Sequence, residues 1–467
     1  MPRGQPPDLL SGVGLGLIFA QIAPMRPSID HIAARVRSQK ERLPAVYGQL
    51  NFDAPPERFT TDLGVETEMR FGASMSRDAL FADADLVARF REYTMLGDVT
   101  GDAYAALMPS QGFRRLVDML VTACDKGVEA VPDAPPELVA LIEDMERVPE
   151  WLDMALVEEG AREDRNSAAN LAPFAIRGAF IATFLNKYSA LPMALTGTLS
   201  HATAARRVKE TATFFTTTIL PGALERFGPG FRAAAMVRLM HSMVRVNVLT
   251  RPGLWDAETY GMPIPQLDQM PAGLIPIYFL SNDVLKAGRT HFTRAERARV
   301  ELARYRCYLL GLPEDLLADT PEDIVRIWCT RSATLRYDYD DKICGGLLRA
   351  TMEAELSADQ SVSARVFRRL ERSFSRVFFA KAFLQGNFGR ARELGVPISL
   401  ADRMLYAATI FVILFRMMAY RVAGHVPGLA GLADARLVKR LRRQLAGYGH
   451  AEFTTDAASY RPAVAGG

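Results

Sequence analysis

One histidine stands between two arginines in a segment with the composition of a buried helix. Residues 230–245 (GFRAAAMVRLMHSMVR) place Arg238 three positions before His241 and Arg245 four positions after it, so a helix carries all three on one face. A neutral imidazole is a common ligand of metals and of haem iron, and neighbouring positive charges favour the neutral form. The two guanidinium groups can also bind anionic groups such as haem propionates. A core histidine with arginines that extend to water is the structural alternative, and the spacing alone leaves both open.

A second segment carries a charge and a hydroxyl at helical spacing. Arg207 and Thr211 are four positions apart in residues 200–212 (SHATAARRVKETA) and face the same way on a helix. This pair suits an anionic or oxygen-bearing ligand. A surface arginine beside a threonine that bonds back to a helix carbonyl explains the pattern equally well.

The elements that must position these residues are helices. Long stretches rich in Ala, Leu, Arg and Glu repeat at helical spacing, and Pro and Gly mark their ends. We therefore predict an all-α fold. The expected sections are a helical lead-in over residues 1–60, a main domain over 61–345, a C-terminal helical section packed on it over 346–450, and a disordered tail over 451–467.

Composition excludes several classes of protein. A net charge of +3 in 467 residues argues against a nucleic-acid surface, which needs a clustered basic face. The four cysteines form no C-x-x-C or C-x-x-C-H motif, so covalent c-type haem attachment is excluded and any haem is held non-covalently. Isolated cysteines, and an apolar stretch at residues 13–20 too short and glycine-rich for a signal, lead us to expect a cytoplasmic protein.

Two segments near the C-terminus bear on membrane contact. Residues 404–418 (MLYAATIFVILFRMM) form the strongest apolar run, but it is shorter than a membrane-spanning helix and contains Arg416. We expect it to be a buried core helix. Residues 436–443 make a basic helix that is either a solvated face or a peripheral contact with an anionic membrane.

Taken together, several segments resemble the latex clearing protein family, the rubber oxygenase and MpaB-type oxygenase superfamily. The two segments around Arg207 and His241 look like its paired signature. Further similar segments follow in order over roughly residues 140–345: 148–153 (VPEWLD), Trp255, 261–268 (GMPIPQLD), Arg306, 310–316 (LGLPEDL) and 320–323 (TPED).

The resemblance implies a helical fold with a globin-like core that holds one non-covalent haem b. It implies that His241 is the proximal iron ligand, with Arg207 and Thr211 on the distal side and Arg238 or Arg245 paired with propionates. Family members use O2 to cleave carbon–carbon double bonds in isoprenoid chains. The implied partners are therefore O2 and a small apolar substrate, while the oligomeric state is left open.

The chain departs from the family at three points. Val246 stands where rubber-cleaving members carry a further histidine, residues 189–200 contain no carboxylate where those members have an acidic residue, and Glu210 replaces a distal lysine. We hypothesise that Glu210 supplies the missing carboxylate and moves a proton in the distal pocket. A solvated Glu210 paired with Arg206 or Arg207 is the alternative.

Three hypotheses for function remain at this point. The first is a haem b-dependent oxygenase acting on an apolar, isoprenoid-like substrate other than polymeric rubber. The second is a haem-binding or haem-sensing protein without oxygenase turnover, which the missing distal base would favour. The third is a helical, membrane-peripheral lipid-binding protein that has lost haem.

Overall fold

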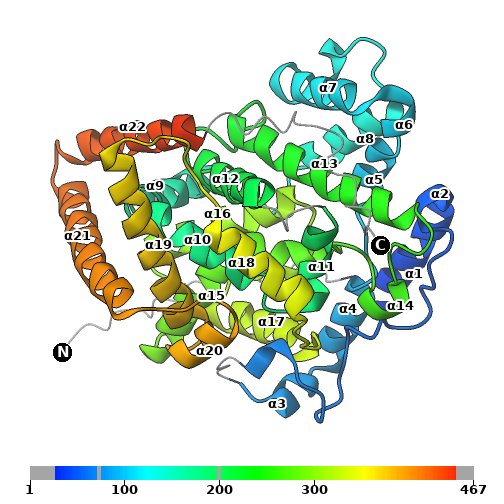
Figure 1. Cartoon of the computed structure of the whole chain (residues 1–467). Coiled ribbons are helices and arrows are strands. Elements are labelled where there is room, and N and C mark those ends of the chain that lie inside the picture. Colours follow the sequence, from blue (N-terminus) through cyan, green and yellow to red (C-terminus); the bar gives the residue numbers. More distant parts are fainter. Residues whose placement is uncertain (1–26, 71–74, 197–200, 449–467) are drawn as a thin grey trace, which may run out of the picture.

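The computed structural model describes residues 27–70, 75–196 and 201–448, and this part of the chain is almost wholly helical (Figure 1). Its only β-type pairings are two isolated bridges, Phe59 with Leu335 and Thr67 with Arg336. The predicted all-α fold is confirmed. The apolar stretch at residues 13–20 and the predicted tail over 451–467 lie outside the described residues.

The α-helices are α1 (Ile29–Arg42), α2 (Pro44–Tyr47), α3 (Arg77–Phe81), α4 (Ala84–Tyr93), α5 (Val99–Ala105), α6 (Met108–Gln111), α7 (Phe113–Lys126), α8 (Pro136–Glu146), α9 (Met154–Asn170), α10 (Ala172–Ala182), α11 (Lys187–Leu195), α12 (His201–Thr217), α13 (Pro229–Leu249), α14 (Ala257–Tyr260), α15 (Met270–Lys286), α16 (Arg294–Leu309), α17 (Pro321–Thr334), α18 (Gly346–Glu353), α19 (Val362–Phe383), α20 (Phe388–Glu393), α21 (Leu400–His425) and α22 (Ala430–Tyr448). Short turns are η1 (Glu68–Arg70), η2 (Val128–Ala130), η3 (Gln266–Gln269), η4 (Glu314–Leu316) and η5 (Asp341–Gly345).

Helix α13 lies inside the molecule and organises its surroundings. It begins with Pro229 at its first turn, where a missing N–H costs nothing, and most of its side chains are buried. One side packs on α5 and α7, and another side packs on α12 and α16. The contact with α5 is close, because a Cβ at Gly101 would meet the Ser242 hydroxyl at 2.5 Å. Glycine at this position therefore lets α5 carry its polar side chains up to α13.

A second group of helices surrounds α12 and α13. Helix α9 packs along α16, α10 packs along α19, and α15 packs on both α16 and α17. The predicted C-terminal section joins the rest through a shared apolar cluster that includes Phe180 and Ile181 of α10, Leu347 of α18 and Phe379 of α19. The predicted section boundaries themselves stay predictions.

Helix α21 differs from the expectation for residues 404–418. The helix is 26 residues long and apolar enough to cross a membrane by length and composition, yet only 11% of its most apolar window is buried. It is an outer element that packs on α19, α9 and α22 through one narrow face (Figure 1). The expectation of a buried core helix was wrong, because apolar composition alone does not show whether other helices cover both sides of a segment.

Candidate functional site

A largely apolar cavity of about 610 Å³ lies between α9, α10, α11, α12, α13 and α15. This volume is in the usual range for pockets that hold a small molecule or cofactor. Among its lining residues, the polar groups that concern function are Arg207, Glu210, Thr211, His241 and Arg306. The structure therefore brings together four of the residues predicted from sequence and adds a fifth, Arg306.

His241 enters this cavity from the middle of α13. Val237, His241 and Val244 all line it, as expected for residues three to four apart on one helical face. Burial, followed by the charges of Arg245 and Arg207, lowers the pKa of the imidazole to about 4. A hydrogen bond with Gln269 acts on the pKa in the opposite direction but does not reverse the shift. The Nδ1 atom of the imidazole is buried and has no hydrogen-bond partner in the described part of the chain. The side chain is thus a neutral imidazole at neutral pH, and its Nδ1 has coordinating capacity that the protein does not use.

Helix α12 contributes a charged pair and a hydroxyl to the same cavity. Glu210 is only 7% exposed, and its Oε2 accepts a 2.9 Å hydrogen bond from Nη1 of Arg207. The Nε atom of Arg206 lies 3.7 Å from the other carboxylate oxygen, and Thr211 also lines the cavity. The two alternatives for Glu210 are a carboxylate of the distal pocket and a solvated partner of Arg206 or Arg207. The structure combines parts of both, because the carboxylate pairs with arginines but is buried in the cavity wall.

Arg238 and Arg245 have a different position from the one expected. Arg238 Nε lies 2.5 Å from Asp98, and Arg245 Nη1 lies 2.9 Å from Asp102. Neither arginine lines the cavity, because their guanidinium groups reach toward α5, on the other side of His241. The expectation that they bind haem propionates is therefore corrected, since both have buried carboxylate partners within the protein.

The buried carboxylates of α5 also explain the electrostatics of this region. Burial raises the pKa of Asp98, but the charge and hydrogen bond of Arg238, together with Arg245 and the Gly101 N–H, outweigh burial and lower the pKa to about 2. For Asp102, burial dominates and raises the pKa to about 6 despite Arg245. The Tyr47 hydroxyl donates to Asp102, and Arg238 also reaches Asp144 at 2.5 Å. These groups form a network of buried ion pairs and hydrogen bonds on the core side of α13.

Comparison with known proteins decides the family. Residues 167–417 match the family "ER-bound oxygenase mpaB/B'/Rubber oxygenase, catalytic domain", which is more than half of the chain. The chain belongs to this oxygenase family. A solved structure of latex clearing protein in the closed state has the same fold, with a TM-score of 0.51 and 17% sequence identity over 75% of this chain and 91% of that chain. No curated protein gives a significant match.

The family match and the predicted resemblance overlap but are not the same. The MpaB/rubber oxygenase match begins at residue 167 and continues to 417, past the predicted boundary at 345 and into α21. It contains Arg207, Glu210, Thr211, His241 and Arg306, so every polar group discussed for the cavity lies within the shared oxygenase domain. Helix α22 lies beyond it.

Arg306 is the feature of this oxygenase that the sequence reasoning missed as a site residue. It lines the cavity from α16 and is 7% exposed, and its buried Nε has no hydrogen-bond partner among the described residues. No carboxylate of the described chain lies at ion-pair distance, although Asp164, which also lines the cavity, attracts the guanidinium from farther away. Its guanidinium lies 5.9 Å from the Phe215 ring, and burial lowers its pKa. The sequence showed Arg306 only as one residue of a family-like segment, and nothing in that segment indicates that the arginine has no carboxylate partner.

A neighbouring arginine shows the contrast. Arg331 of α17 also lines the cavity, but it lies 2.9 Å from Glu68 and 3.5 Å from Asp268. Arg58 binds the same Asp268 at 3.0 Å. Asp268 ends the family-like 261–268 segment, so this part of the oxygenase motif carries ion pairs that join three regions of the chain.

A smaller chamber of about 240 Å³ adjoins the main cavity of this oxygenase. Seven residues line both spaces: Ala179, Thr183, Ser189, Pro271, Ile275, Arg331 and Phe383. Beyond them, the smaller chamber is lined by aromatic side chains such as Tyr278, Phe279 and Trp328. The two spaces together suit an elongated apolar molecule.

The described residues contain no group of three or more His, Cys, Asp and Glu side chains that could hold a metal ion. His241 is the histidine in the lining of the main cavity, and one imidazole can ligate a metal whose other ligands come from a cofactor.

Proposed function

We propose that this protein is a haem b-dependent oxygenase that uses O2 on a small apolar substrate, with an isoprenoid chain as the expected class. Membership of the oxygenase family supports the reaction type. The observation that carries the proposal is the neutral His241 imidazole, with an unpartnered nitrogen, in an apolar cavity of cofactor size.

The residues present fit haem b. His241 would ligate the iron, and Arg306 would bind a propionate in place of Arg238 and Arg245, because it is the cavity arginine without a carboxylate partner in the described chain. When bound, haem iron supplies the binding and activation of O2. The apolar walls exclude water from this chemistry.

The polar side chains of α12 would transfer a proton and hold an oxygen atom of the reactants by a hydrogen bond. The Glu210 carboxylate can hold or release a proton at Oε1, the oxygen without a hydrogen bond among the described residues, while Arg207 fixes its other oxygen. The Thr211 hydroxyl can donate a hydrogen bond to an oxygen atom in the cavity. A long apolar substrate would extend from the main cavity into the aromatic chamber.

We further propose a cytoplasmic location. All four cysteines are buried and form no disulfide among the described residues, which supports a reducing compartment.

The first experiment is the absorption spectrum of protein produced with haem supply. We expect a Soret band that is lost or strongly altered in His241→Ala and unchanged in the control His291→Ala, whose side chain is exposed. A wild-type protein that takes up no haem would contradict the proposal.

Oxygen consumption with isoprenoid substrates forms the second arm. We expect turnover by the wild type and, for Glu210→Gln, a kcat lowered by about 100-fold with haem binding unchanged. A protein that binds haem through His241 but consumes no O2 with any such substrate would favour the haem-binding or haem-sensing function instead.

A further inference from the structure

The outer face of α21 is a broad apolar surface. Eight large apolar side chains along α21 are more than half exposed: Leu400, Met404, Phe411, Val412, Leu414, Phe415, Met418 and Val422. Phe411 and Phe415, one helical turn apart, are 73% and 69% exposed. Exposed apolar surface that is contiguous in this way is unusual for a protein surrounded by water and indicates an interaction site.

The opposite face of α21 holds the helix flat on the protein. Ile413 packs with Phe374 of α19 and Ala175 of α10, and the Asn166 amide of α9 donates to the Met417 carbonyl at 2.9 Å. A helix attached along its length to a protein core exposes only one side to an apolar medium. This geometry suits a helix that lies in a membrane interface rather than one that crosses the bilayer.

The charges beside this apolar surface are almost all positive. Residues 400–448 contain eight Lys and Arg but only two Asp, in a chain whose net charge is +3. Both acidic side chains already have partners, because Asp402 accepts from Ser373 and Ser399 and Asp434, which lines the groove described next, pairs with Arg165. No carboxylate of this segment is therefore left to neutralise its exposed basic residues.

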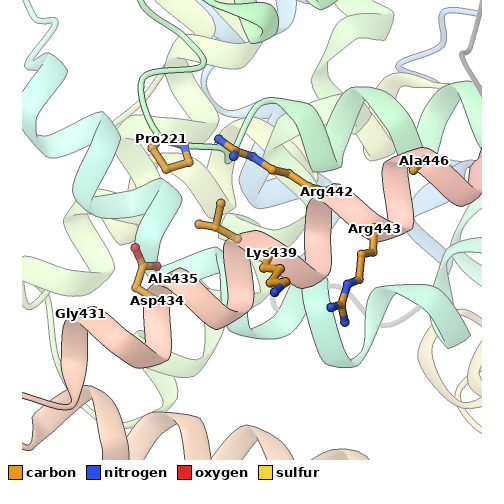
Figure 2. Close-up of a pocket in the computed structure, with 9 residues that line it drawn as sticks. Pro221, Gly431, Asp434, Ala435, Lys439, Arg442, Arg443 and Ala446 are labelled. Carbon is orange, nitrogen blue, oxygen red and sulfur yellow. The ribbon is translucent and has the colours of Figure 1, made fainter.

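Helix α22 arranges several of these basic residues around a shallow groove. Lys439, Arg442 and Arg443 line a space of about 700 Å³ against Pro221, and all three are exposed (Figure 2). Arg442 extends toward Pro221, whereas Lys439 and Arg443 extend outward from the helix (Figure 2). Helix α22 packs on α21, so the groove belongs to the helix next to the one that carries the apolar surface.

We propose that α21 and α22 together form a docking surface for a membrane of anionic phospholipids. The apolar face of α21 would enter the acyl-chain boundary, and the basic side chains of α22 would contact lipid phosphates. Charge complementarity selects this occupant over a second copy of the chain, since pairing two such surfaces would bring two sets of arginines together.

The surface also bears on substrate supply, a point that rests on the proposed function. Leu171 and Ala175 line the cavity and pack in the same apolar cluster as Ile413 of α21. Helix α10 is thus a wall shared by the cavity and the docking region. An apolar substrate dissolved in the bilayer would be concentrated next to the cavity that uses it.

Vesicle flotation tests the docking surface without any catalytic readout. The probes are vesicles of phosphatidylcholine alone and of phosphatidylcholine mixed with phosphatidylserine. We expect the full chain to float with the mixed vesicles and weakly with the neutral ones. Phe411→Asp/Phe415→Asp should abolish flotation with both, and Lys439→Glu/Arg443→Glu should weaken binding to the mixed vesicles only, by about fivefold or more for each charge removed.

Val148→Asp is the matched control, because Val148 is 72% exposed and lies outside this surface. It should float like the wild type, and thermal melting of each variant checks folding. Flotation retained by folded Phe411→Asp/Phe415→Asp would overturn the proposal. So would a wild type that stays with the aqueous fraction and sediments as a dimer that this variant dissociates, which would assign the surface to a second copy. Because flotation needs neither haem nor substrate, its result is independent of the oxygenase proposal.

Discussion

Buried arginines lie on two sides of α13, and those on one side have carboxylate partners whereas the one on the other side has none among the described residues. On the core side, Arg238 and Arg245 are held by Asp98, Asp102 and Asp144 of α5 and α8. On the cavity side, Arg306 is equally buried and has no carboxylate partner in the described chain. His241 stands at the border, since it lines the cavity while the two paired arginines point away from it.

The difference separates structure from ligand binding. Removing one partner of a buried ion pair destabilises a protein by about 3–5 kcal/mol, because it leaves a buried charge unpaired, whereas the intact pair is close to neutral. On the core side, both arginines therefore have carboxylate partners within the folded chain. The cavity side has a guanidinium with no carboxylate at ion-pair distance among the described residues, and Asp164 of the same cavity acts on it only from farther away. A ligand can therefore supply a closer counter-charge.

The largest expected effect follows from breaking the core side. Asp102→Ala leaves Arg245 buried beside an apolar side chain and removes the acceptor of the Tyr47 hydroxyl. Near neutral pH, where Asp102 is ionised because its pKa is about 6, we expect the free energy of unfolding to fall by about 3–5 kcal/mol. Urea denaturation of the haem-free protein measures this change.

An exposed ion pair between α13 and α7 provides the control for that experiment. Arg232 of α13 lies 2.7 Å from Asp125, but both side chains are more than a third exposed. Asp125→Ala should cost at most about 1 kcal/mol, since water screens such pairs. Equal losses for the two variants would show that burial does not separate the two kinds of arginine.

The histidine at the border gives the second effect, which is a loss of stability in acid. The pKa of His241 falls from 6.5 to about 4 on folding, so the unfolded chain binds this proton more readily. The stability that the neutral imidazole contributes is fully present above pH 6.5 and is lost as the pH falls toward 4, a change of about 3 kcal/mol.

Asp102 opposes this trend, so the measurement must isolate the histidine. Its raised pKa, about 6, contributes stability that is present below its ordinary value of 3.8 and is lost as the pH rises through 6. The difference in unfolding free energy between the wild type and His241→Gln cancels the contribution of Asp102. This difference should shrink from pH 6.5 to 4, and a constant difference would mean that His241 titrates normally.

Sequence reasoning reached the fold and the faces of single helices but not the partners across helices. Helical periodicity correctly grouped Arg207 with Thr211, and the family-like segments indicated the family. The same periodicity placed Arg238 and Arg245 beside His241, but it could not show that Asp98 and Asp102, about 140 positions earlier, would reach them first. Exposure of α21 was missed for the same reason, because burial depends on neighbours that are distant in sequence.

The smallest effect is also the sharpest test, because its sign differs between two arginines of one cavity. Arg306→Leu removes a buried charge without a partner, so the haem-free protein should become more stable by about 1–3 kcal/mol. Arg331→Leu in the same wall should destabilise it, since Glu68 and Asp268 would lose a buried partner. Arg306→Leu should bind haem about 10- to 100-fold more weakly than the wild type, which is the value of one charged hydrogen bond. Haem whose propionates are esterified carries no carboxylate charge, so it should bind the wild type and Arg306→Leu equally well. If weakening appears instead only with a carboxylate-bearing substrate, the counter-charge of Arg306 belongs to the substrate. Destabilisation by both substitutions would show that Arg306 is a structural residue like Arg238 and Arg245.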